Sequence, residues 1–318
     1  MAAPSPEAIR IEVSRAEERI RPWILETPVI ASPLGPVLKL ENRQHTGSFK
    51  ARGAFSKLLS LEPGELAGGV IAASTGNHGA AVAYAAARIG TRARIVVPEN
   101  ADAGKLAAIE ALGARVEVQG ADSAESEARA RGESERDGVP YVSPYNDPAV
   151  IGGQGTVATE LVRQLPGADA VFIALGGGGL LAGVAAELKA YWPQVRVIGC
   201  SPANSAVMIE SVRAGRILRL ESKPTLSDGT AGGIEPGAIT FELCRTLGDE
   251  YVTVSEGEIL AAMRRIRDTH GFLVEGAAGV ALAGYLGQAE RWKGRKAVVV
   301  LCGGNVSPEV LDGGGARS

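Results

Sequence analysis

The fold is decided by residues 170–192, which read AVFIALGGGGLLAGVAAELKAYW. The apolar run 170–175 is typical of a buried β-strand, and the Ala- and Leu-rich segment 180–192 is typical of a helix. Four consecutive glycines, Gly176 to Gly179, separate the two. A strand, a glycine turn and a helix in this order form the repeating unit of α/β proteins.

The same order recurs along the chain. Three more apolar runs are each followed by a helical segment: 70–73 by 80–89, 93–97 by 104–112, and 195–200 by 206–214. This alternation predicts a mostly parallel sheet with helices on both faces. Open α/β sheets bind ligands beyond the carboxyl ends of their strands, so we expect the functional site at the glycine-rich turns that follow the strands.

The composition narrows the possible partners. The 318 residues are 45% hydrophobic and carry a net charge of −3, so the chain can bury a sizeable core and has no charge excess that would favour nucleic acid or an anionic membrane. Its three cysteines, Cys200, Cys244 and Cys302, form no CxxC pair, which suits a reducing cytoplasm. No apolar run approaches the roughly 18 residues of a membrane span. Because the sequence ends soon after the apolar run 297–302, we expect no C-terminal regulatory domain.

Candidate chemistry begins at Ser48-Phe49-Lys50-Ala51-Arg52-Gly53. A lysine beside an aromatic residue is ordinarily a surface lysine whose aliphatic stem lies on apolar neighbours. Here three further segments accompany it, each directly after a predicted strand: Ser74-Thr75-Gly76-Asn77-His78-Gly79, the glycines 176–179, and Leu301-Cys302-Gly303-Gly304-Asn305. Together and in this order, the four segments resemble the fold-type II pyridoxal-5′-phosphate (PLP) enzymes. That group contains threonine and serine dehydratases, serine racemase and the tryptophan synthase β subunit.

Taken alone, each segment also allows a simpler interpretation. Ser74 or Thr75 is a good N-cap residue for the helix that follows, whose free N–H groups would otherwise suit a carboxylate or a phosphate. Cys302 fits a buried structural thiol, and Arg52 fits a structural ion pair as well as a part of an active site. The glycines 176–179 can hardly serve packing, since glycine loses more backbone entropy than other residues. They fit a nest of N–H donors around a phosphate better than a flexible loop.

The resemblance implies a two-domain α/β fold with PLP in the cleft between the domains. The large domain would comprise residues 1–45 and 143–318, and the small domain residues 46–142. A lysine in such enzymes holds PLP as a Schiff base and, as a free amine, removes the α-proton of the substrate, and this role carries over onto Lys50. The implied cofactor-binding residues are Phe49, Lys50, Asn77, Gly176, Gly177, Gly178, Gly179, Gly229 and Cys302.

Within that set, the resemblance places Asn77 at the phenolic oxygen of PLP and Cys302 at the pyridine nitrogen. The implied substrate loop, which grips the amino-acid carboxylate, is Ser74, Thr75, Gly76, Asn77 and His78. His78 would be held for its backbone and not as a base. Glu275 is either a carboxylate near the site or a structural residue.

The expected reaction is the loss of water from a β-hydroxy amino acid, by default L-threonine or L-serine, which yields a 2-oxo acid and ammonia. A 3-hydroxyaspartate or phenylserine remains open as the substrate, as does racemisation with Thr75 as the acid opposite Lys50. A protein that binds a phosphorylated ligand without catalysis is the non-enzymatic alternative. We expect a homodimer. Metal-dependent relatives place a Glu and then an Asp where this chain has Ser201 and Val207, so we expect no divalent metal site.

Overall fold

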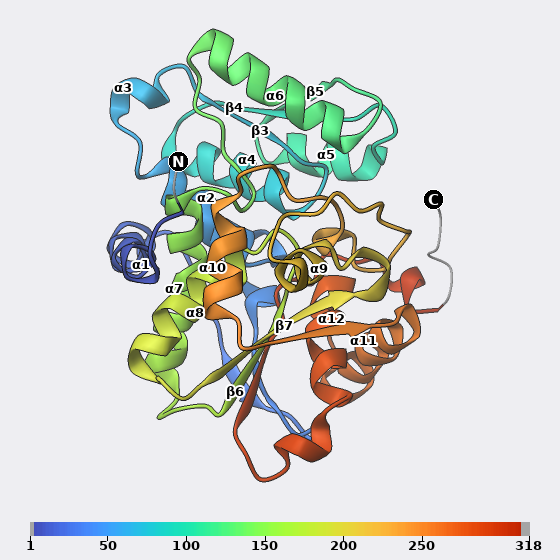
Figure 1. The fold of residues 1–318 in the computed structure, drawn as a ribbon. Helices are drawn as coiled ribbons and strands as arrows, with labels where there is room; N and C mark the ends of the chain where they lie inside the picture. Colours follow the sequence, from blue (N-terminus) through green and yellow to red (C-terminus); the bar gives the residue numbers. More distant parts are fainter. Residues whose placement is uncertain (1–2, 313–318) are drawn as a thin grey trace.

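Two separate sheets organise the chain (Figure 1). The computed structural model describes residues 3–312. The larger sheet has six strands in the spatial order β1 (Val29–Ala31), β2 (Val37–Lys39), β9 (Ala297–Val300), β6 (Ala170–Ala174), β7 (Arg196–Pro202) and β8 (Glu250–Val254). The smaller sheet has three, in the order β3 (Val70–Ala73), β4 (Ala93–Val97) and β5 (Arg115–Val118). The β1–β2 pair is antiparallel, and the other strand pairs of both sheets are parallel.

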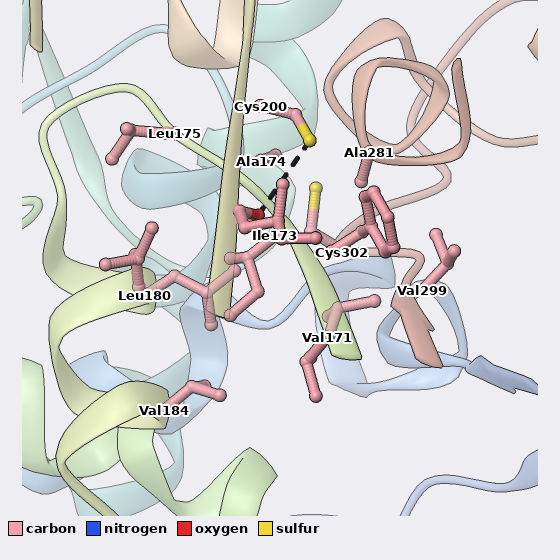
Figure 2. Close-up of a cluster of buried hydrophobic side chains, with 14 of the residues drawn as sticks. Val171, Ile173, Ala174, Leu175, Leu180, Val184, Cys200, Ala281, Val299 and Cys302 are labelled. Atoms are coloured by element: carbon pink, nitrogen blue, oxygen red, sulfur yellow. Dashed lines mark hydrogen bonds between the residues drawn. The ribbon is translucent and has the colours of Figure 1, made fainter. Parts of the chain in front are cut away.

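Helices cover both faces of the larger sheet. Helix α8 (Gly179–Tyr191) lies on one face, with α1 (Pro6–Ile20), α7 (Pro148–Gln164) and α10 (Ile239–Leu247) packed around it (Figure 1). Helix α12 (Gly276–Leu286) lies on the other face, with α11 (Glu256–His270) packed against it. Helix α9 (Val207–Ala214) packs on α10. Strands β6 and β9 are therefore buried along their whole length, as expected of central parallel strands. Figure 2 shows the side chains that fill this core around β6, among them Val171 and Ile173.

The smaller sheet is layered in the same way. Helix α4 (Asn77–Ile89) packs on one face, with α2 (Lys50–Leu58) and α5 (Ala103–Ala111) against it, and α6 (Ser123–Asp137) packs on the other (Figure 1). The short helix α3 (Pro63–Leu66) precedes β3. A second apolar cluster fills this part of the chain. Because α2 packs against both α4 and α7, its first residue lies where the two layered units meet.

The predicted α/β class, with mostly parallel strands and helices on both faces, is confirmed. The helices after β3 and β6 begin earlier than predicted, at Asn77 and Gly179, because glycine-containing turns lead directly into them. The division into domains at residues 46 and 142 stays a prediction. Within residues 3–312 no helix is long and apolar enough to cross a membrane.

Candidate active site

The amine of Lys50 is enclosed at the start of α2. Phe49, the N-cap residue of that helix, donates its backbone N–H to the carbonyl of Cys302 at 3.0 Å, which ties the start of α2 to the end of β9. Lys50 Nζ donates to the carbonyl of Pro144 at 2.8 Å and lies 5.2 Å from the centre of the Phe49 ring. Burial lowers the pKa of Lys50 to about 8, although the nearby Cys302 and Glu275 act in the opposite direction. At neutral pH this lysine therefore has a larger neutral, nucleophilic fraction than an exposed one.

The glycine turn 176–179 does serve packing, contrary to the prediction. Three of its glycines allow close approach by neighbours that an added Cβ would meet: the Thr230 backbone, 2.8 Å from a Cβ at Gly176; the Tyr145 ring at Gly177; and Cys244 Sγ, 2.7 Å from a Cβ at Gly178. Gly178 also has φ of +89°, which L-residues rarely adopt. Glycine occurs here despite its entropic cost because a side chain would prevent these close contacts.

The same turn presents free hydrogen-bond donors. Among the residues that the structure describes, the backbone N–H groups of Gly176, Gly177 and Gly178 donate to no protein acceptor. Gly179 begins α8, and the N–H groups in the first turn of a helix have no partner within that helix. Donors in this arrangement suit a phosphate. The phosphate role of these glycines stays a prediction, now supported by the donors and not by the number of glycines.

The start of α4 is uncapped. The N-cap residue is Gly76, and neither Ser74 nor Thr75 caps the helix, so the simpler interpretation of this segment is wrong. Ser74 Oγ instead accepts the backbone N–H of Gly76 at 3.1 Å, before the helix begins. The first N–H groups of α4 therefore have no side-chain acceptor in this part of the chain, and they suit the carboxylate of an amino acid.

The side chain of His78, in the first turn of α4, points into the protein. His78 is 4% exposed, and its Nε2 lies 2.8 Å from the carbonyl of Val142, which can only accept, so Nε2 carries the hydrogen. Burial, with the charge of Lys50, lowers the pKa of His78 to about 3. The imidazole is neutral at physiological pH and serves as a donor to the backbone.

Asn77 links the two layered units. Its Nδ2 donates to both oxygens of Glu275, at 2.9 and 2.8 Å, and its Oδ1 accepts from Asn305 Nδ2 at 2.7 Å. Burial raises the pKa of Glu275 to about 7. Gly229 lies beside the same carboxylate, since a Cβ added to Gly229 would be 3.7 Å from Glu275 Oε1. The sequence left the role of Glu275 open, and its spacing from the other motifs gave no sign of this contact.

Cys302 is a buried thiol at the edge of the core of the larger sheet. It is 2% exposed, and Figure 2 shows it near Val299 and Ala281. Burial raises its pKa well above the ordinary value, with Glu275 adding to the effect, so the thiol is neutral. Its carbonyl accepts the N–H of Phe49, which places Cys302 beside the start of α2, where Lys50 lies.

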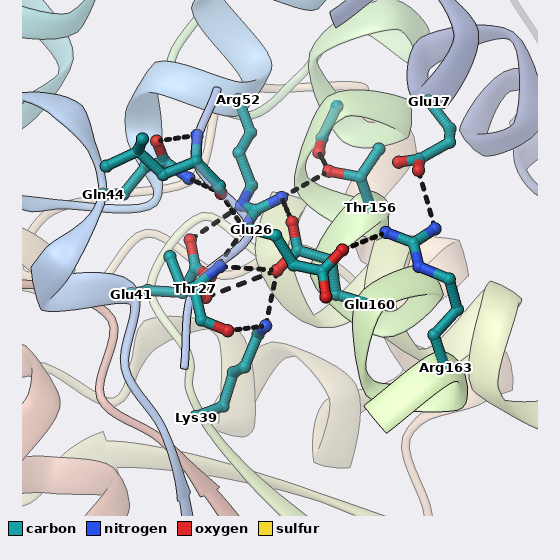
Figure 3. Close-up of polar contacts among 12 residues, drawn as sticks. Glu17, Glu26, Thr27, Lys39, Glu41, Gln44, Arg52, Thr156, Glu160 and Arg163 are labelled. Atoms are coloured by element: carbon teal, nitrogen blue, oxygen red, sulfur yellow. Dashed lines mark hydrogen bonds and ion pairs between the residues drawn. The ribbon is translucent and has the colours of Figure 1, made fainter. Parts of the chain in front are cut away.

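Arg52 belongs to a buried charge cluster, as its structural interpretation predicts (Figure 3). Its guanidinium donates to Glu41 and to Glu160, each at 2.7 Å, and Lys39 also pairs with Glu160. None of these four side chains is more than 2% exposed, and their two positive charges balance the two negative ones. Burial alone would raise the pKa of Glu160, but Arg52 and Lys39 outweigh it and hold that pKa below the ordinary value. The cluster fixes α2, and hence the start of the helix that carries Lys50, against α7 and β2.

The site thus brings Lys50, Phe49 and Cys302 together, and Pro144 and Tyr145 connect the lysine to the glycine turn. Residues 20–303 match the family of the pyridoxal-phosphate dependent enzymes. The chain belongs to this family. PLP is therefore the cofactor of this PLP-dependent enzyme, as predicted.

Individual relatives agree with the family match. This PLP-dependent enzyme is 42% identical to L-threonine ammonia-lyase of Thermotoga maritima over 275 residues, which cover 86% of this chain and 68% of that protein. Its fold is similar to that of the processed threonine deaminase isoform 2 from Solanum lycopersicum, with a TM-score of 0.91, 33% identity and 98% and 93% of the two chains covered. It is also similar to maize serine racemase, with a TM-score of 0.89, 31% identity and coverage of 96% and 95%.

The residues present fit PLP. An enclosed lysine with a lowered pKa is suited to an aldehyde, and the free N–H groups at Gly176, Gly177 and Gly178 are suited to a phosphate. Pro144 and Tyr145 were missed at the sequence level, because they belong to none of the four segments and their contacts depend on how α7 packs.

Ser201 and Val207 occupy the positions where metal-dependent relatives have Glu and Asp. Ser201 Oγ donates to the carbonyl of Leu175 at 2.6 Å, and Val207 is buried. Within the described residues no group of three or more His, Cys, Asp or Glu side chains could hold a metal ion.

Proposed function

We propose that this enzyme removes water from a small β-hydroxy amino acid, with L-threonine and L-serine as its first substrates. The products are the corresponding 2-oxo acid and ammonia. The observation that carries the proposal is the enclosed Lys50 amine, whose pKa of about 8 leaves part of it neutral at physiological pH. The L-threonine ammonia-lyase that is 42% identical to this chain supports the choice of reaction.

The residues of the chain divide the work between binding and proton transfer. When bound, PLP acts as an electron sink for the charge left at the α-carbon of the substrate. The neutral amine of Lys50 accepts the α-proton, and the carbonyl of Pro144 gives the free amine a hydrogen-bond partner. The uncapped N-terminus of α4, formed by Thr75 to His78, binds the carboxylate of the substrate.

The leaving group departs with a proton as water. The enamine that remains takes up one water as it hydrolyses to the 2-oxo acid and ammonia, so the water released is balanced by the water consumed and no oxidant is needed. Cys302 contributes by its neutrality, since a thiol that stays protonated places no full negative charge beside the cofactor ring.

A substrate panel tests the proposal. Purified holoenzyme is incubated with L-threonine, L-serine, 3-hydroxyaspartate and phenylserine, and 2-oxo acid release is measured. The proposal expects the highest kcat/KM with threonine or serine. Preference for either of the other two would move the assignment to that substrate, and no 2-oxo acid from any of the four would refute it.

Racemisation is the second candidate, favoured by the likeness to maize serine racemase and by the hydroxyl of Thr75 beside the uncapped helix start. Chiral chromatography of serine recovered from the same incubations separates the two reactions. D-Serine forming faster than pyruvate would favour the racemase.

The assembly and the location of the enzyme are also proposals. We propose a homodimer in the cytoplasm, where its three cysteines, all free and buried, would stay reduced. Light scattering of the purified holoenzyme at a monomer mass would rule out the dimer.

A further inference from the structure

Glu275 uses its carboxylate in an unusual way. It is the N-cap residue of α12, yet its side chain accepts no hydrogen bond from that helix. Instead the carboxylate of this residue, which is 7% exposed, faces Asn77 on α4, a helix of the other layered unit. Gly303 makes room for it, since a Cβ at Gly303 would overlap the carboxylate. The carboxylate of Glu275 therefore contacts Asn77 in the other layered unit instead of capping its own helix, α12.

The contact fixes the orientation of the Asn77 amide. Asn305 Nδ2 donates to Asn77 Oδ1, while Asn77 Nδ2 faces the carboxylate of Glu275, so the two ends of the amide cannot exchange places without losing both contacts. Asn305 is itself held by its donation to the carbonyl of Thr46 at 2.7 Å. The amide is thus anchored at both ends before any ligand binds.

The geometry also leaves one donor over. The two oxygens of one carboxylate are so close together that, seen from Asn77 Nδ2, they subtend an angle far smaller than that between the two N–H bonds of an amide. A single N–H is therefore shared between both oxygens of Glu275. The second N–H of Asn77 stays available to a ligand.

We propose that Glu275 is a positioning residue that acts through Asn77, by holding the amide so that its second N–H is presented to the cofactor. This inference rests on PLP binding beside Lys50 and not on the identity of the substrate. Its failure would therefore leave the proposed reaction untouched.

If Glu275 holds Asn77 in place, PLP binding should depend on whether Glu275 is charged. Asn77 from α4 contacts Glu275 directly. The other groups that act on its charge are Lys50 from α2, the exposed Asp228 from the loop before α10, and Cys302 and Asn305 after β9. Burial raises the pKa of Glu275 to about 7, and Asp228 adds to the rise, whereas Asn77 and Lys50 oppose it. Above this pH the carboxylate accepts with both oxygens. Below it one oxygen carries a proton, the shared hydrogen bond is lost, and Asn77 is held less firmly.

The experiment measures PLP binding to the apoenzyme by fluorescence titration between pH 6 and 8, without turnover. Glu275→Gln keeps the shape of the side chain but removes the charge, and we expect it to raise the Kd for PLP about tenfold at pH 8. Lys50 and PLP titrate in every variant, so the effect of Glu275 is read from the ratio of the Kd of Glu275→Gln to that of the wild type at each pH. The ratio of the two Kd values should shrink as the pH falls through about 7, because the wild-type protein then also loses its carboxylate.

Two further proteins sharpen the test. Glu187→Gln is the matched control, since Glu187 is 3% exposed and its pKa is also raised by burial. It lies on α8 beside Thr159, away from the contacts of Asn77 and Glu275. This variant should bind PLP as the wild type does. In Asn77→Ala, adding Glu275→Gln should cause no further loss, because residues that act as one unit are not additive.

Glu275→Asp, which keeps the charge, serves if Glu275→Gln does not fold. Because both proteins then carry a carboxylate, the ratio of its Kd to that of the wild type should stay constant as the pH falls through about 7. A Glu275→Gln protein with wild-type Kd at all pH values, or losses that add in the double variant, would overturn the proposal.

Discussion

Removing Arg52 should destabilise the fold more than the loss of any exposed arginine. In Arg52→Met the carboxylate of Glu41, which is 0% exposed, keeps only the hydroxyl of Thr27 as a hydrogen-bond partner among residues 3–312, at 2.6 Å. Glu160 keeps Lys39, so the cost falls mainly on Glu41. Removing one partner of a buried ion pair typically costs about 3–5 kcal/mol, because the other charge stays buried without compensation. We therefore expect a loss of about 3–5 kcal/mol in the free energy of unfolding.

The assay is urea unfolding of the holoenzyme, followed by far-UV circular dichroism. Arg163→Met is the matched control, because Arg163 lies on the neighbouring helix α7, is 41% exposed in its side chain, and pairs with Glu17 and Glu26 (Figure 3). It should cost less than about 1 kcal/mol. Adding Glu41→Gln to Arg52→Met should recover part of the loss, since the unpaired charge is gone. An Arg52→Met protein no less stable than Arg163→Met would refute the assignment of a buried, balanced cluster.

Three further predictions concern the site. The rate at which the apoenzyme captures PLP should rise with pH and level off above about 8, because only the neutral amine of Lys50 attacks the aldehyde; a rise that continues toward 10.5 would contradict its lowered pKa. Activity should persist in chelator without added Mg²⁺, given the Ser201 hydroxyl bonded to a carbonyl and the apolar Val207, and a loss that Mg²⁺ reverses would show a metal site. Cys302→Ser should retain most activity, whereas Cys302→Asp should protonate the ring nitrogen, slow elimination and increase racemised substrate and pyridoxamine phosphate; an unchanged spectrum and product ratio in Cys302→Asp would mean that this thiol does not face the cofactor.

The sequence predicted most of the fold because the strand signals are local. The apolar runs at 70–73, 93–97 and 170–175 became β3, β4 and β6, since buried parallel strands read as continuous apolar segments. The order of the strands in the larger sheet, in which β9 lies between β2 and β6, could not be read from the sequence, because it depends on contacts between residues that are far apart in the chain.

Part of the site could also be predicted, because some of its residues form local motifs. The motif around Lys50 and the glycine turn are continuous segments, and they stand out when read together. The contact between Asn77 and Glu275 joins residues that lie 198 positions apart, and no spacing rule connects them. For the glycine turn 176–179, the sequence analysis predicted that glycine does not serve packing, and the structure shows that it does. Gly177 leaves space for the Tyr145 ring. The sequence could not show this close approach, because it depends on how α7 packs beside α8.

We propose that Lys50 holds PLP and moves the proton at the α-carbon of the substrate. This role is tested most directly by the rate of 2-oxo acid formation from L-threonine at saturating PLP, compared between wild type, Lys50→Ala and the control Lys293→Ala, whose lysine side chain is 79% exposed. We expect Lys293→Ala to match the wild type and Lys50→Ala to lose more than about 100-fold in rate, because the base is gone. A Lys50→Ala enzyme that turns over threonine at the wild-type rate would contradict this role of Lys50.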